Sequence, residues 1–133
     1  MKRWMLCLFG LVVIFITGYF VFNNEDGKQR EVRIVAEYQA IKHPEGAKLV
    51  HYELNRKIIN RWIRSRYTYP MSNDEVIIFY NRELTEVGWQ KVPSNLKRKD
   101  IDFIYVKENM KLLLGLNNDN SWALNIYYMD ANY

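Results

Sequence analysis

Cysteine and histidine are scarce in this chain. Its 133 residues include one cysteine, Cys7, and two histidines, His43 and His51. A single cysteine excludes an intramolecular disulfide, and the place of Cys7 in an apolar run predicts a small apolar side chain and not a reactive thiolate. Acylation of Cys7 is the alternative.

The sequence also lacks the combinations of residues on which most enzymes depend. His43 precedes Pro44 in an expected turn, and His51 shares a strand face with Glu53, a pair with too few ligands for a firm metal site. No serine lies in a G-x-S-x-G context, and the glycines form no phosphate loop. We predict no catalytic site, cofactor or metal; an enzyme with a dispersed active site is the alternative.

Neither positive nor negative residues are in strong excess. The chain has 19 Lys and Arg residues and 15 Asp and Glu residues, and Lys2 and Arg3 precede the first apolar run. The rest of the chain is therefore close to neutral, well short of the basic excess typical of nucleic-acid-binding domains. No nucleic-acid partner is expected.

Charge is wholly absent from residues 4–22, where Thr17 is the only polar side chain. A helix of this length spans about 28 Å, close to the ~30 Å hydrocarbon core of a bilayer. The run is longer than the apolar region of a usual signal peptide, and no small-x-small cleavage site follows it. We predict a transmembrane anchor at 1–22, with a cleaved signal peptide as the alternative.

The charges that flank this run predict its orientation. Lys2 and Arg3 lie on the short N-terminal side, and the first charges on the other side are acidic, Glu25 and Asp26. Basic flanks favour the cytoplasm. We expect a single-pass protein of the cytoplasmic (inner) membrane, with its N-terminus in the cytoplasm and its C-terminal domain outside.

After a polar linker at 23–28, residues 29–133 are expected to form one α+β domain. Helical spacing of apolar residues predicts a helix over 29–41. Alternation of apolar and polar residues predicts six strands, at 47–56, 58–69, 89–92, 101–106, 110–116 and 122–128. The first two strands should form a hairpin that turns at 55–57.

A second helix is expected over 72–87. Ser72 and Glu75 have the spacing of a capping box, and Gly88 suits the residue after the helix end. Phe79, Leu84 and the following Trp89 are predicted core residues. The order helix, two strands, helix, four strands predicts an antiparallel sheet covered on one face by the amphipathic helix.

One stretch resembles a pattern seen in small uncharacterised bacterial proteins that are membrane-anchored or lipidated. The pattern reads P-x-G-A … S-x-x-E … F-Y-x(3)-L-x(3)-G-W, and it covers residues 41–92 well. The matching positions here are Pro44, Gly46-Ala47, Ser72, Glu75, Phe79-Tyr80, Leu84 and Gly88-Trp89, with Tyr67 before them on a strand. The resemblance implies a fold and an envelope location, and no activity.

The most suggestive surface lies along the second predicted strand. Residues 56–66 contain no acid and several bases, with an aromatic beside them: Arg56, Lys57, Arg61, Trp62, Arg64 and Arg66. Lys97, Arg98 and Lys99 would extend this surface if their loop folds near it. A basic face with an amphipathic aromatic suits anionic headgroups or an acidic envelope polymer. The alternative is an ordinary solvated sheet face.

These observations lead to one expectation for function. We expect a membrane-anchored binding or interaction module of the bacterial cell envelope, whose partner is an envelope protein or an anionic envelope polymer. The alternatives are a domain that binds anionic lipid or wall polymer through the basic surface, and an enzyme with a site not visible in the sequence.

Overall fold

The computed structural model describes residues 2–22, 24–93 and 103–130, and its fold is α+β. A long helix, α1 (Lys2–Phe22), comes first. It is followed by α2 (Glu25–Ala40), β1 (Lys48–Lys57), β2 (Asn60–Thr68), α3 (Asn73–Glu86), β3 (Gln90–Val92), β4 (Phe103–Lys107), β5 (Met110–Leu116) and β6 (Ser121–Tyr128). The predicted class and order of elements are confirmed.

The six strands form one antiparallel sheet in the order β1-β2-β6-β5-β4-β3. The last strand, β6, lies between β2 and β5, so it joins the N-terminal hairpin to the three remaining strands of the sheet. The long edge strand is β1 and the short one is β3. The predicted antiparallel sheet of six strands is confirmed, whereas its strand order could not be read from the sequence.

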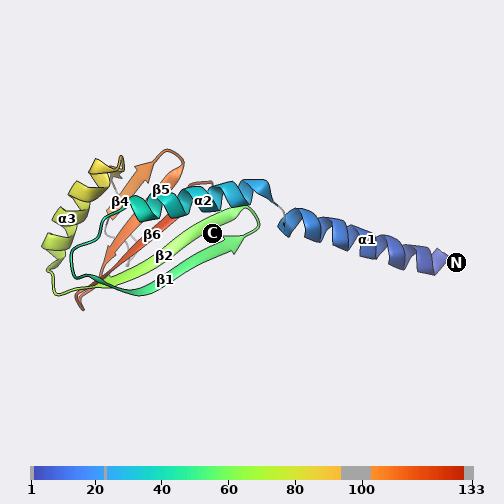
Figure 1. Cartoon of the computed structure of the whole chain (residues 1–133), viewed down its shortest axis with the longest axis horizontal. Coiled ribbons are helices and arrows are strands. Elements are labelled where there is room, and N and C mark those ends of the chain that lie inside the picture. Colours follow the sequence, from blue (N-terminus) through green and yellow to red (C-terminus); the bar gives the residue numbers. More distant parts are fainter. Residues whose placement is uncertain (1, 23, 94–102, 131–133) are drawn as a thin grey trace.

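Helices α2 and α3 bury apolar side chains against the strands. Helix α2 contacts β2 and β6, and α3 contacts β3. Figure 1 shows α2 lying along the sheet and α3 at the end of the domain farthest from α1. Fully buried side chains from both helices and four strands make the core: Ile34, Tyr80, Leu84, Ile63, Tyr105, Leu112, Leu114, Leu124 and Ile126.

Helix α3 begins and ends as its local sequence predicts. The Ser72 hydroxyl accepts a hydrogen bond from the Glu75 amide at 3.2 Å, and the Glu75 carboxylate accepts one from the Ser72 amide at 2.8 Å. Gly88 follows the helix with φ +90°, which L-residues with a Cβ rarely adopt. The predicted capping box is confirmed.

Helix α2 begins earlier than expected. The stretch 23–28 was predicted to be a linker, but α2 starts at Glu25 and therefore includes most of it. The side chain of Asn24 caps the helix by accepting from the Gly27 amide at 3.3 Å, and Glu25 and Asp26 suit the positive end of the helix dipole. These capping signals outweigh the low helix propensity of Gly27.

The hairpin turn also differs from its predicted position. It was expected at 55–57, but Lys57 still pairs with Asn60, so the turn consists of Ile58 and Ile59. Ile58 has φ 54°, a left-handed conformation that is unusual for a β-branched residue. Two isoleucines read as strand in the sequence, which explains the misplacement.

One lysine joins three elements on the helix-covered side of the domain. Lys107 of β4 donates to the Glu37 carboxylate of α2 at 2.7 Å and to the Val87 carbonyl at the end of α3 at 2.7 Å. Its charge offsets the partial negative charge of the α3 C-terminus. The two helices are thereby held to the sheet and to one another.

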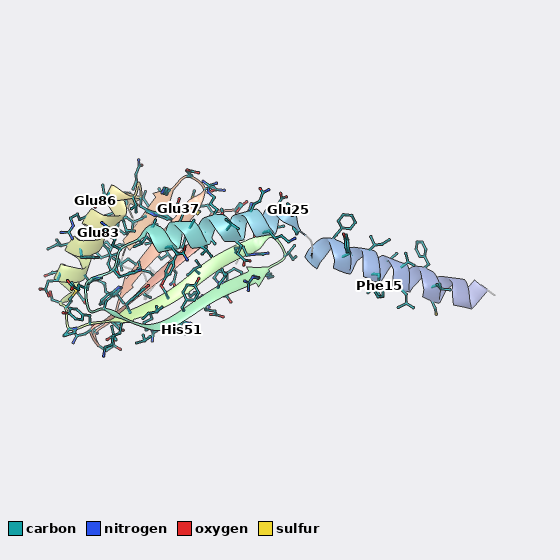
Figure 2. All side chains as sticks on the ribbon, in the orientation of Figure 1. Phe15, Glu25, Glu37, His51, Glu83 and Glu86 are labelled. Carbon is teal, nitrogen blue, oxygen red and sulfur yellow. The ribbon has the colours of Figure 1, made fainter. Side chains whose placement is uncertain are left out.

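The described side chains of α1, from Cys7 to Phe20, are not buried against the domain. In the described part of the chain one helix is long and apolar enough to cross a membrane, and none of its apolar window is buried. Large apolar side chains point outward all round it, and Figure 2 shows Phe15 well clear of the domain. This exposure excludes the core helix of a soluble protein, whereas a signal sequence has the same length and composition.

The predicted core residues are only partly correct. Leu84 and Trp89 are 0% and 1% exposed, but Phe79 is only half-buried and lies at the margin of the core, with the Arg82 guanidinium 5.5 Å from its ring centroid. Its neighbour Tyr80 takes the central position instead. The buried face of α3 is therefore the predicted one, with Val76, Tyr80 and Leu84 at its centre and Phe79 at its edge.

The burial of α3 predicts a contrast between two alanine variants. Leu84→Ala should lower the free energy of unfolding by about 2–5 kcal/mol, because it leaves a cavity in a fully buried site. Phe79→Ala should cost about 1–2 kcal/mol, because its ring is already partly hydrated. Urea unfolding in detergent, followed by tryptophan fluorescence, measures both, and equal losses would contradict this account of the core.

Candidate functional site

The structure divides the six predicted binding residues between the two faces of the β1–β2 hairpin. Opposite residues of an antiparallel pair share a face, and Arg56 lies opposite Arg61. Both bind α2, as shown below, so they occupy the helix-covered face. The remaining four lie on the other face, which is called the outer face here: Lys57, Trp62, Arg64 and Arg66.

On the helix-covered face, Glu31 of α2 binds both arginines. Its carboxylate accepts two hydrogen bonds from Arg56, at 2.8 and 2.7 Å, and one from Arg61 at 3.0 Å. The bonds from Arg56 are the main reason that the pKa of Glu31 is lowered. The Arg61 guanidinium is almost buried and also donates to the carbonyls of Ile58 and Asn60, both at 2.8 Å. These arginines hold the hairpin to α2, and Glu31 pairs with both guanidinium groups, although the Arg56 side chain stays 57% exposed.

On the outer face, the exposed cations follow β2. Arg64 and Arg66 are exposed, and Trp62 beside them is half-buried. Glu53 of β1 lies opposite Arg64, and Asp119 is close enough to Arg66 for the two charges to interact, so acids lie beside both arginines. The structure therefore brings together a smaller basic surface than the sequence suggested. Lys97, Arg98 and Lys99 lie outside the described residues.

His51 and Glu53 stand on the same outer face, where Figure 2 labels His51 on β1. The His51 Nε2 atom is 3.8 Å from a Glu53 carboxylate oxygen, and both side chains are about half exposed. Among the described residues no group of three or more His, Cys, Asp or Glu side chains could hold a metal ion. The pair is an ordinary surface contact.

His43, expected in a turn before Pro44, has partners that the sequence did not reveal. His43 follows α2, and both of its ring nitrogens have tyrosine partners: Nδ1 lies 2.9 Å from the Tyr80 hydroxyl and Nε2 lies 2.9 Å from the Tyr67 hydroxyl. The His43 ring stacks on Tyr67 with centroids 4.1 Å apart. Tyr67 also bonds the Tyr38 hydroxyl, and Trp122 Nε1 donates to Tyr80 at 2.9 Å. We call these five residues the His43 network.

The donors and acceptors in the His43 network assign the proton on its imidazole. Trp122 has only an N–H to give, so the Tyr80 oxygen accepts it. The Tyr80 hydroxyl is then free to donate to Nδ1 of His43, and Nε2 carries the proton that Tyr67 accepts. Every group along this path is satisfied when His43 is neutral.

Burial keeps the network uncharged at neutral pH. It lowers the pKa of His43 to about 4 and raises the pKa values of Tyr67 and Tyr80 well above their usual range. A neutral imidazole whose two nitrogens are both engaged offers no free nitrogen to a metal or substrate. The His43 network therefore joins α2 to β2, α3 and β6, and carries no acid–base chemistry at neutral pH.

The lowered pKa of His43 predicts a loss of stability in acid. An unfolded histidine takes up its proton near pH ~6.5, whereas the folded one resists it until about pH 4, so the unfolded state binds more protons in between. Stability is full above pH ~6.5 and falls as the pH drops through this window, by about 2–3 kcal/mol after allowance for partial exposure. Urea unfolding at a series of pH values measures it.

Two variants provide the controls. His43→Gln should be less stable at pH 7 and should lose most of the dependence between pH 6.5 and 4, because the titrating group is gone. His51→Gln should keep the wild-type dependence, because His51 is exposed. The same slope in all three proteins would mean that carboxyl groups alone cause the acid sensitivity.

A signal for the His43 network was present in the sequence. Tyr38, Tyr67 and Tyr80 all fall on faces expected to be buried, and a buried tyrosine hydroxyl needs a partner. His43, directly after the helix that carries Tyr38, was the nearest candidate. The partners lie on separate elements, so spacing alone could not connect them.

Comparisons with family models, curated proteins and solved structures give no match to this chain. The resemblance to small anchored bacterial proteins stays a prediction.

Proposed function

We propose that this chain is a membrane-anchored binding module whose α+β domain lies outside the cytoplasmic membrane of a bacterial cell, with α1 as its uncleaved span. The observation that carries the proposal is the all-round exposure of the apolar side chains of α1. The Thr17 hydroxyl donates to the Val13 carbonyl at 2.6 Å, so it needs no water. A helix with its polar groups satisfied internally suits hydrocarbon on every side. Lys2 and Arg3 favour a cytoplasmic N-terminus.

A binding role is favoured over catalysis by what the described side chains do. His43 is neutral with both nitrogens engaged, and His51 lies 3.8 Å from Glu53 and opposite Arg66 on the edge strand. The outer face, in contrast, presents Arg64 and Arg66 to solvent beside the ring of Trp62. Guanidinium groups next to an amphipathic aromatic are typical of a surface that binds an anion-bearing partner.

The position of these arginines along β2 favours a ligand beyond the lipid headgroups. Arg64 and Arg66 lie four and six residues from Asn60, about 13 and 20 Å from the hairpin end of the strand. That end is the one next to α1 in Figure 1. Attraction between exposed charges fades over about 8 Å at physiological salt. We therefore propose an acidic envelope polymer as the ligand, in preference to anionic lipid.

Proteolysis of intact spheroplasts tests the anchor and its orientation. Added protease should degrade the domain while a cytoplasmic control protein survives, and the membrane fraction should hold the chain at full length. Protection of the domain would reverse the orientation. A soluble form that lacks the first 22 or so residues would show that α1 is a cleaved signal.

Retention on immobilised polygalacturonate or polyphosphate tests the outer face. The full chain in nanodiscs of phosphatidylcholine should bind at low salt and elute as salt rises, and Arg64→Glu with Arg66→Glu should weaken binding about tenfold or more. Lys28→Glu with Lys42→Glu changes the net charge equally on residues that are exposed elsewhere, and should change binding little. Equal losses in both variants would mean that net charge, and not this surface, causes retention.

A further inference from the structure

The turn between β1 and β2 combines two unfavourable features. Ile58 and Ile59 form the turn, and they are 64% and 37% exposed. Ile58 is also in the left-handed region, with φ 54°, where Asn or Gly is favoured and a β-branched residue is strained. Neither feature stabilises a hairpin turn that faces water. Strained and exposed apolar positions of this kind often occur at binding sites.

The turn is held firmly against the beginning of α2. Arg61 donates to the Ile58 carbonyl and binds Glu31 of α2. Gly27 of α2 packs so closely here that a Cβ on it would lie 2.7 Å from the Arg61 guanidinium and 3.4 Å from the Ile58 oxygen. The two isoleucines are therefore presented from a fixed position and not from a loose loop.

That position is close to the end of α1. Gly27 is five residues after Phe22, where α1 ends, and five residues span at most about 18 Å of chain. The turn therefore stays near the end of α1 whatever angle the two helices make. Figure 1 shows the closed end of the hairpin on the α1 side of the domain, with α3 at the opposite end.

We infer that Ile58 and Ile59 insert into the interfacial layer of the bilayer that α1 spans, so that the domain contacts the membrane at two points. This inference rests on the proposed membrane anchor. Because α1 keeps the turn close to the bilayer, even a small gain from burying two apolar side chains is enough to hold it there. Lys57 next to the turn can extend to the headgroups.

The charges around the turn indicate whether its proposed contact with the bilayer is apolar or electrostatic. Glu25 and Asp26 in the first turn of α2 balance Lys28 and Lys57, and Glu31 pairs with both Arg56 and Arg61, so these groups leave one net positive charge beside the turn. The contact is therefore apolar and should form on uncharged phosphatidylcholine and survive high salt. This separates it from the salt-sensitive outer face formed by Arg64 and Arg66.

A single fluorescent label tests the contact in the full chain. Cys7→Ala removes the only cysteine, after which Ile58→Cys or Ile78→Cys takes an NBD label. Ile78 is the matched control, because it is 66% exposed but lies on α3. In phosphatidylcholine liposomes, lipids with a nitroxide near the headgroup should quench the label at 58 several-fold more than the label at 78, at low and high salt.

The possible results separate the two claims. If the chain floats with the liposomes and both labels report water, the membrane contact of the turn is wrong and the anchor stands. If the chain does not float with them, the anchor and the contact both fail.

A second variant distinguishes the contact from a role in folding. Ile58→Asn suits the left-handed backbone, so the domain should unfold at the same urea concentration or a higher one. With the label moved to Ile59→Cys, the same change should at least halve the lipid quenching. Undiminished quenching, or a clear loss of stability, would mean that Ile58 serves the fold and not the membrane.

Discussion

The Glu31 carboxylate accepts hydrogen bonds from Arg56 and Arg61, and this contact couples the hairpin to the helix that directly follows α1. The Arg61 side chain is almost buried, so its charge requires a partner. The ion pair with Glu31 fixes the position of the guanidinium. Through its bonds to the Ile58 and Asn60 carbonyls, the same guanidinium sets the form of the turn. Ile58 therefore lies near the end of α1 because Glu31 binds Arg56 and Arg61 on the two strands of the hairpin.

At its other end, α2 is held by a different kind of interaction. Tyr38 and the following His43 enter the neutral hydrogen-bonded network that includes Tyr67, Tyr80 and Trp122. The groups of this network are neutral, which avoids the cost of an unpaired charge where water is excluded. Lys107 binds Glu37 in the last turn of α2, so these contacts together fix the C-terminal end of the helix to the sheet.

Features that depend on neighbouring residues were predictable from the sequence, and α3 is the clearest case. Ser72, Glu75 and Gly88 act within one or two turns of chain, and they define the helix in the structure as they do in the sequence. Strand alternation likewise predicted the bounds of β5. It also predicted that Arg64 and Arg66 lie on one face of β2 and that Ile63 and Tyr67 lie on the other face. The face of a strand follows from its period of two residues.

Features that depend on distant partners were not predictable. Arg61 looked like one more exposed base because Glu31 lies 30 positions away, and no local spacing connects them. His43 looked like a turn residue because its partners come from β2 and α3. The hairpin turn was misplaced for another reason, since Ile58 and Ile59 have the composition of a strand and not of a turn. Residues whose type does not fit their local structure, such as two isoleucines in a turn, commonly occur at functional sites.

The attachment of the hairpin to α2 also determines which surfaces a ligand can reach. Helix α2 is 16 residues long, about 24 Å, and lies against β2 with its first turn next to α1. Helix α2 contacts β2 and β6, α3 contacts β3, and the closed end of the hairpin lies on the α1 side of the domain (Figure 1). The outer face of β1 and β2 keeps Arg64 and Arg66 exposed toward the far half of β2, with Glu53 opposite Arg64 and Asp119 close enough to Arg66 for the two charges to interact. In the proposed arrangement, the turn at the near end of the domain contacts lipid through apolar side chains, and an anionic polymer binds the arginines farther along the strand.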